Sequence, residues 1–125
     1  MPFPPDIERV VSDSGALLVI TGRPAVDNRF VALAFQFAAG TLHLRCDDDT
    51  DEVVLEVAEH DPGYPKVTNR ALADLVDMSI QDVWELTNQR GYTDAFQLRL
   101  RANDGRTESR QFEVAASAMD VLTVS

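Results

Sequence analysis

The sequence predicts an α+β fold dominated by antiparallel β-structure: two meanders of about three strands each, joined by one short helix and closed into a sandwich or a barrel-like sheet. Three observations support this prediction. Apolar residues alternate with polar or small ones in several short stretches, which is the period of strands with one covered face. Clusters of glycine, proline and aspartate separate these stretches, as turns do. After residue 66 the alternation changes once to a helical spacing.

The N-terminal segment opens with PFPP, which fits neither a helix interior nor a central strand. Residues 1–5 are therefore expected to form a loose lead-in. From Ile7 we expect a short strand, followed by a turn at 13–15 and a second strand over 16–22.

The first meander is predicted from alternating stretches at 30–37, 42–46 and 52–58. The first of these, FVALAFQF, places every second side chain on one apolar face. A glycine turn at residue 40 links it to the next strand, which indicates a hairpin. The acidic run at 47–51 interrupts the pattern before the third strand, so these stretches are expected to pair in sequence order.

A short helix is predicted over 69–78, because Leu72, Leu75 and Val76 follow the helical spacing. Asn69 or Thr68 is the expected N-cap.

The second meander is predicted from strands at 80–88 and 94–102, with the NDG sequence at 103–105 as a tight turn. The mostly polar stretch at 106–114 is expected to return as an edge strand protected by its charges. Residues 119–124 then close the sheet.

The composition is that of one soluble globular domain spanning residues 1–125, with 45% hydrophobic and 26% charged residues. No signal peptide and no apolar run of membrane-spanning length is visible, so we expect a cytoplasmic protein without membrane contact. The formal net charge of −10 disfavours conventional nucleic-acid binding, because such binding depends on Lys and Arg that neutralise phosphates.

The cysteine and histidine residues point to no metal site. The single cysteine, Cys46, excludes an internal disulfide and a multi-cysteine zinc site, and its alternating context favours a buried apolar role. His43 and His60 lie in no metal-binding spacing and are expected at the surface, His43 on the outer face beside Arg45.

The acidic run contains Asp47, Asp49 and Asp51 at the spacing that begins a calcium loop, but the glycine and the glutamate that this loop needs are missing. A solvated turn is the favoured interpretation. The GxSxG, GxxxxGK and GxGxxG signatures are absent as well. We therefore predict no catalytic residue, metal or cofactor, and the sequence argues against an enzyme without excluding one.

The segment WELTNQRGYTD at 84–94 has the highest density of functional side chains in the sequence. In a hairpin, Gly91 would take a positive φ, Asn88 would cap the turn, and Trp84 and Leu86 would anchor the strand in the core. The remaining polar groups can bind a ligand or partner, or pair among themselves with Arg90 bridging an acid. The candidate binding residues are Glu85, Asn88, Gln89, Arg90, Tyr92 and Asp94.

This segment, with the FQLRL strand and the later FEVAAS strand, resembles a small bacterial family of unknown function that carries a W-E-x-T-N-Q-x-G-Y-x-D motif. The likeness extends over most of 30–124 and is specific at 84–94. It implies no activity, cofactor or partner.

Three functions stay open. The first is a non-catalytic protein-interaction module, a homodimer that uses the hairpin or an exposed sheet face. The second is a small-ligand binder or enzyme, with Glu85 or Asp94 as general base and Tyr92 and Asn88 as hydrogen-bond donors. The third is an acidic decoy that mimics nucleic acid.

Overall fold

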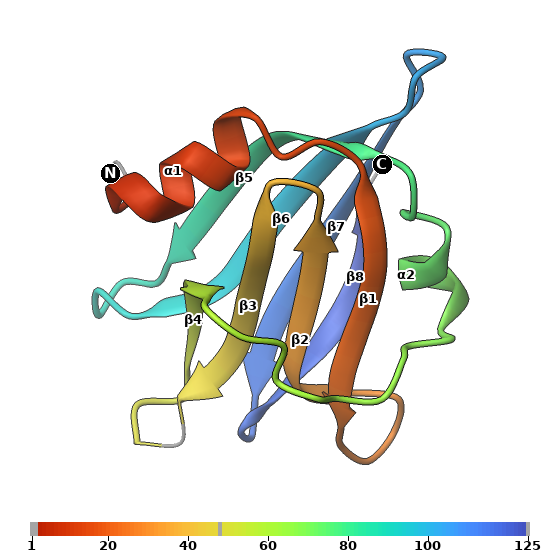
Figure 1. Cartoon of the computed structure of the whole chain (residues 1–125). Helices are drawn as coiled ribbons and strands as arrows, with labels where there is room; N and C mark the ends of the chain where they lie inside the picture. The colour runs from red at the N-terminus through yellow and green to blue at the C-terminus, as the bar shows by residue number, and fades with distance from the viewer. Residues whose placement is uncertain (1–2, 48, 125) are drawn as a thin grey trace.

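The chain is described by a computed structural model that covers residues 3–47 and 49–124. The predicted fold class is confirmed: the protein is β-rich, and its antiparallel sheet curls into a half-barrel accompanied by two short helices (Figure 1). In chain order the elements are α1 (Pro5–Ser12), β1 (Leu17–Pro24), β2 (Phe30–Phe37), β3 (Gly40–Asp47), β4 (Glu52–Ala58), α2 (Arg70–Ala73), β5 (Ser79–Thr87), β6 (Thr93–Arg101), β7 (Thr107–Ala115) and β8 (Ala118–Val124).

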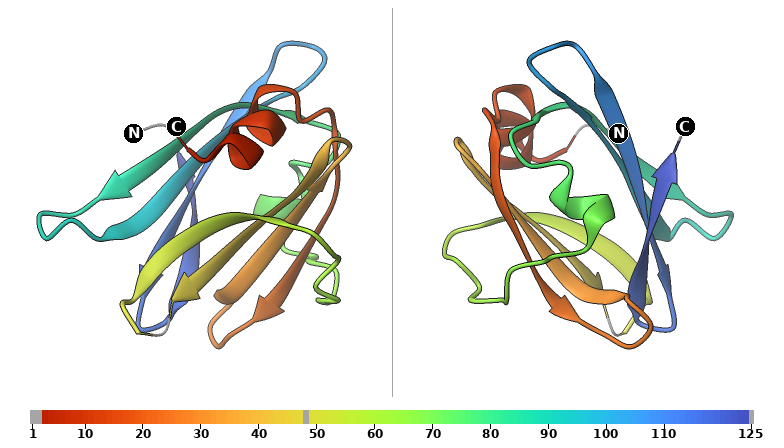
Figure 2. Two further views of the ribbon diagram at one scale, coloured as in Figure 1. Left: turned by 60° about the vertical axis from the view of Figure 1, so that its left-hand side comes forward. Right: turned by 90° about the vertical axis from the view of Figure 1, so that its right-hand side faces the viewer.

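The strands form two meanders, β1–β4 and β5–β8, that meet between β2 and β8. The strand order is β4-β3-β2-β8-β7-β6-β5, and β1 pairs with β2 off this path. The register between β2 and β8 consists of one pair, Phe30 with Met119. Because the two strands separate beyond this pair, the meanders face each other as two layers, as Figure 2 shows. Strands β4 and β5 are the two ends of the path.

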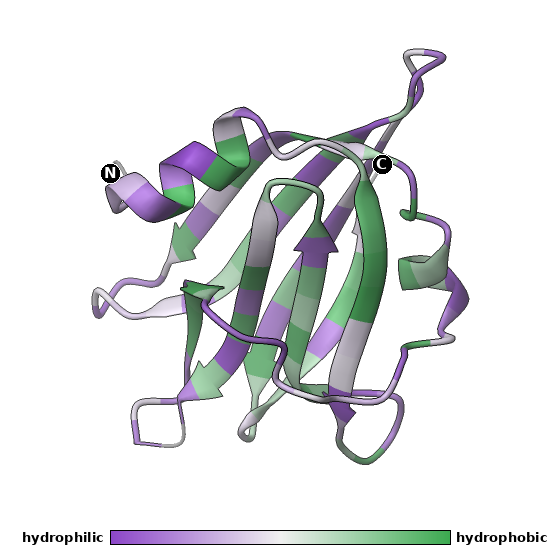
Figure 3. Ribbon diagram, in the orientation of Figure 1, coloured by the Kyte–Doolittle hydropathy of each residue, from purple (hydrophilic) through white to green (hydrophobic). Residues whose placement is uncertain are grey.

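One hydrophobic core fills the space between the layers. Phe35 of β2 contacts Phe112 of β7 edge to face, with ring centroids 5.6 Å apart. Phe112 also pairs in register with Phe96 of β6, so both rings point inward. The alternation that predicted these strands appears as changing colours along the ribbons in Figure 3. The two meanders therefore cover each other's apolar face.

The strand expected from Ile7 is wrong, because this segment forms helix α1. Proline is tolerated in the first helical turn, where its missing N–H has no partner to lose, and Pro5 begins the helix. Ile7 and Val10 are buried on one face of the helix. Of the expected loose lead-in, residues 1–2 lie outside the described residues, while Phe3 stacks on Phe96.

The helix predicted over 69–78 is shorter than expected. α2 has four residues, and the chain continues through turns to Asp77, whose φ is +75°. Asn69 is the N-cap, as predicted, and its Oδ1 accepts a hydrogen bond from Ala71 N. Leu72, Leu75 and Met78 are fully buried. Figure 2 shows that α2 lies between the layers on the side of β1 and β8, so this segment closes the gap where β2 and β8 separate.

The assignment of 106–114 as an edge strand is wrong, because β7 lies between β6 and β8. Its polar sequence has a different cause. Arg110 points inward, is 4% exposed, and donates from Nε to Ala71 O of α2 at 2.7 Å. The turn predicted at 103–105 is confirmed, with Gly105 at φ +90° and a hydrogen bond from Ala102 N to Arg106 O.

The acidic run between β3 and β4 forms a turn, as expected. Asp51 N donates to Asp47 O, and Asp49 N donates to the Asp47 side chain. Asp48 lies outside the described residues. Asp51 Oδ1 also accepts from Ser117 N in the β7–β8 turn, so this carboxylate links the two layers at one end of the molecule.

Candidate functional site

The 84–94 segment is a hairpin, as predicted, formed by the end of β5, a tight turn and the start of β6. Asn88 organises the turn: its Oδ1 accepts hydrogen bonds from Arg90 N at 2.9 Å and Tyr92 N at 3.2 Å. Gly91 has a φ of +84°, which a side chain would penalise. The side-chain oxygen of Asn88 is thus occupied by hydrogen bonds within the turn. Figure 2 shows the hairpin extending beyond the body of the molecule.

Trp84 does not anchor the strand in the core, contrary to the prediction. It is 39% exposed and lies on the outer side of β5, where the guanidinium carbon of Arg99 stands 5.2 Å from the centre of its ring. The reason is the register: Trp84 pairs with Gln97, whose neighbours Phe96 and Leu98 point inward. Inward positions on β5 belong to Ile80 and Val83 instead.

The two acids proposed as alternative bases lie in different places. Glu85 lies beside Phe3 and Phe96 in a cleft at the border of the sheet, and its Oε1 accepts from Thr93 Oγ1 at 3.3 Å. Asp94 lies at a separate hollow beside Leu86. The structure therefore does not bring the two carboxylates together in one pocket.

The other predicted binding residues lie at the exposed tip. Gln89 and Arg90 are exposed beside Asn88, and Tyr92 is 45% exposed. Among the described residues Arg90 takes part in no ion pair, so the bridge to Glu85 or Asp94 is not formed.

The outer side of β5–β8 forms an uncovered surface, which we call the β5–β8 outer face. Its central row runs across all four strands, because Trp84 pairs with Gln97, Gln97 with Gln111, and Gln111 with Leu122. Leu122 at one end of the row is 40% exposed, and Trp84 at the opposite end is 39% exposed. The sequence prediction missed this row because no local motif marks it. The one signal available in the sequence was the alternation along β6, which places Gln97 on the outer face.

Charges of opposite sign flank the central row. Arg99 lies one row toward the β6–β7 turn, and its Nε donates to Ser109 Oγ at 3.3 Å. Glu113 and Asp120 lie one row toward the other end and oppose each other directly across β7 and β8. Asp120 is paired with Arg29 at 3.4 Å. Asp82 of β5 stands opposite Arg99, so one end of the face carries a charge of each sign and the other end carries two acids.

The outer side of the first meander is covered in part, in contrast. The segment after β4 crosses it on the way to α2, as Figure 1 shows. It is held along β1, where Gly22 N donates to Pro65 O and Val67 N to Ile20 O. Ala32 and Ala34 of β2 are consequently buried although they point outward.

Tyr64 of this crossing segment packs on His43 with ring centroids 5.7 Å apart, and its hydroxyl lies 3.0 Å from His43 Nε2. The His43 side chain is only 14% exposed, so the expected surface position is wrong, although the residue does face outward. The cause is the crossing segment, which a strand pattern cannot reveal.

Glu56 Oε1 lies 2.9 Å from His43 Nδ1 and accepts from Arg45 Nε at 3.0 Å. These contacts lower the pKa of Glu56 below its ordinary value of 4.5: the hydrogen bond with His43 contributes most, and that with Arg45 adds to it against the opposing effect of burial. The cluster fixes the crossing segment on the sheet.

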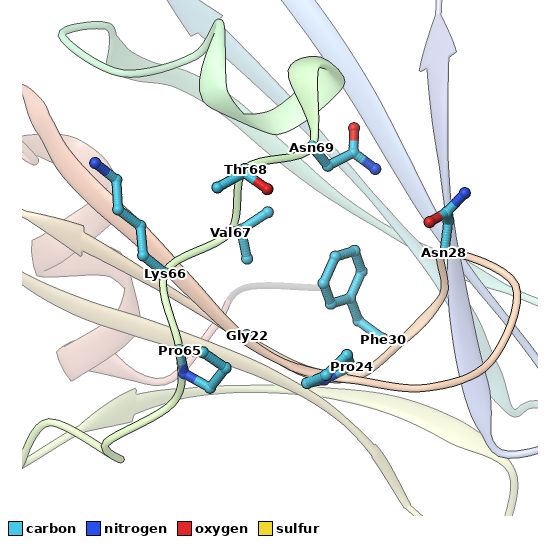
Figure 4. Close-up of a pocket in the computed structure, with 9 residues that line it drawn as sticks. All are labelled: Gly22, Pro24, Asn28, Phe30, Pro65, Lys66, Val67, Thr68 and Asn69. Atoms are coloured by element: carbon cyan, nitrogen blue, oxygen red, sulfur yellow. The ribbon is translucent and has the colours of Figure 1, made fainter.

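A hollow of about 470 Å³ lies where the crossing segment leaves β1 (Figure 4). Phe30 and Val67 form its apolar side, and Asn28, Thr68 and Asn69 its polar side. Asn69 already caps α2, and the Lys66 ammonium points away from the other side chains. No charged group is therefore directed into this hollow.

Residues 9–125 match the family described as "Family of unknown function (DUF6334)". The chain belongs to this family. The match confirms the family of unknown function expected from the 84–94 segment, and it includes every strand of both meanders. No curated protein and no solved structure is significantly similar to this DUF6334 chain.

Within the described part of the DUF6334 chain, no group of three or more His, Cys, Asp or Glu side chains is placed to hold a metal ion. The helices that the structure describes are too short to cross a membrane. Cys46 is buried in the core, as predicted.

Proposed function

We propose that this protein is a non-catalytic protein-interaction module that pairs with a second copy of itself through the β5–β8 outer face. The observation that carries the proposal is the contrast between the two outer sides. A crossing segment covers part of the first, whereas the second exposes Trp84 and Leu122 at the two ends of one row. Exposed tryptophan is enriched in interface centres, where its burial gives much of the binding energy.

The charges of this face support self-association. A two-fold axis that lies in the face and crosses the strands places the Arg99 end of one copy over the Glu113 end of the other. The same operation brings the central rows together, so the aromatic and aliphatic side chains become buried. A stable dimer buries about 800 Å² on each partner, which requires most of the four-strand face.

The test is sedimentation equilibrium or light scattering over a range of concentrations. We expect a concentration-dependent dimer for the wild type. Trp84→Glu, which places a charge in the proposed contact, should weaken association by about 100-fold. The control is Leu18→Glu: Leu18 is 59% exposed on β1, so this variant should dimerise as the wild type does.

Charge exchange tests the orientation of the two copies. Arg99→Glu and Glu113→Arg should each weaken the dimer, because each places like charges together, and the double variant should restore it. Circular dichroism checks that each variant is folded. A wild type that stays monomeric at the highest concentrations contradicts self-association, and a double variant no better than the single ones contradicts the orientation.

A further inference from the structure

The half-barrel has an open seam between its two end strands. β4 and β5 end the strand path, and no strand pairing joins them among the described residues. A hydrogen bond bridges the seam: Glu52 Oε2 at the start of β4 accepts from Thr93 N at the start of β6, at 2.9 Å. Helix α1 packs against β3, β4 and β5 beside this bridge.

A cleft of about 260 Å³ lies in the seam beside this bridge. Phe3, Ile7 and Phe96 give it an apolar wall, and Val53 and Leu55 extend this wall along β4. Phe96 and Leu55 also border the apolar interior between the two layers. The cleft is therefore the mouth of the half-barrel, a common position for small-molecule sites in curled sheets.

The polar side of the cleft is formed by two carboxylates and one threonine. Each carboxylate accepts one hydrogen bond from Thr93. Glu52 Oε2 accepts from the backbone N–H of Thr93, and Glu85 Oε1 accepts from its hydroxyl. Among the described residues, the second oxygen of each carboxylate takes part in no hydrogen bond or ion pair. No Lys or Arg lines the cleft, so its charge is uncompensated locally.

We infer that this cleft binds an amphipathic organic cation: a protonated amine with a short aliphatic or aromatic body. The ammonium group would donate to the second oxygens of Glu52 and Glu85, as charge-assisted hydrogen bonds require. The apolar body would lie against Phe3 and Phe96 and leave water. The net charge of −10 attracts cations toward the site and repels anions. This inference is independent of the proposed dimer, because the cleft lies in the seam of the half-barrel and not on the β5–β8 outer face.

The test is calorimetric titration with n-octylammonium chloride, with n-octanol and sodium octanoate as probes of equal chain length. We expect one equivalent of the amine to bind at least about ten-fold more tightly than the alcohol, and the carboxylate to bind weakest. Amide chemical shifts should change at Thr93 and Glu85. Changes confined to other regions would contradict the assigned site.

Isosteric variants separate recognition of charge from folding. Gln at position 52 or 85 can still accept the Thr93 hydrogen bonds, so Glu52→Gln and Glu85→Gln should fold normally while each weakens amine binding by about ten-fold. Glu59→Gln removes an exposed carboxylate outside the cleft and should leave binding unchanged. Equal binding of amine and alcohol, no binding of either, or an unchanged affinity in both Gln variants would overturn the inference.

Discussion

At the scale of single residues, side-chain partners explain several polar groups that the sequence pattern leaves unassigned. Arg110 has an inward position on β7 that would suit an apolar residue, yet its guanidinium satisfies a carbonyl of α2 and pairs with Glu108 at 3.5 Å. Buried charges are retained where such partners are present. The partner carbonyl lies 39 positions away along the chain, so the local pattern around Arg110 could not predict its role.

Glu56 gives a pH-dependent prediction at the same scale. Its folded-state pKa is lowered by His43 and Arg45, so its contribution to stability is present above the ordinary pKa of 4.5 and is lost as the pH falls through the folded-state pKa. The side chain is 44% exposed, which limits the contribution to about 1 kcal/mol or less.

We therefore expect Glu56→Gln to be less stable than the wild type at pH 7, with the difference shrinking on acidification below about pH 4. Urea unfolding at a series of pH values measures this. The matched control is Glu59→Gln, an exposed neighbour, which should follow the wild type at every pH. A pH-independent gap between Glu56→Gln and the wild type would contradict the assignment.

At the scale of elements, the contact between β1 and the crossing segment depends on one close approach. A Cβ on Gly22 would stand 2.9 Å from Leu33 Cδ2 and 3.0 Å from both Phe30 Cδ1 and Val67 Cγ2. Three buried side chains, two from β2 and one from the crossing segment, thus surround this position. They leave little room for relaxation, because protein interiors are close-packed.

Gly22→Ala should consequently destabilise the protein by about 1–3 kcal/mol through overpacking. Chemical denaturation gives the value. Gly40→Ala serves as the comparison, because its Cβ would meet a single side-chain atom, Val10 Cγ2, at 3.2 Å. We expect a smaller effect there, and equal effects at the two positions would show that the crossing segment moves aside without cost.

At the scale of the whole molecule, stability depends on the two meanders together. Their inner faces form one core, and the β2–β8 register joins them through a single residue pair. Each meander alone would expose its apolar inner face to water. Folding of one half therefore requires the other.

A fragment of residues 79–125 should accordingly be unfolded, with little dispersion in its amide NMR spectrum. Addition of a fragment of residues 1–78 is expected to restore dispersed signals, because the two apolar inner faces then cover each other. A well-dispersed spectrum for residues 79–125 alone would contradict the single-core description.

The sequence by itself determined the strands, most turns and the family, because each depends on neighbouring residues: the alternation in FVALAFQF, the NDG turn and the Asn88–Gly91 turn are all local signals. It did not determine which outer side would be covered. Trp84 was expected in the core because tryptophan is apolar, whereas the register with Gln97 turned it outward. The cleft at Glu52 and Glu85 also required tertiary structure, since these residues are 33 positions apart and meet through Thr93. Contacts between distant segments depend on how the sheet curls, and no local pattern encodes that curvature.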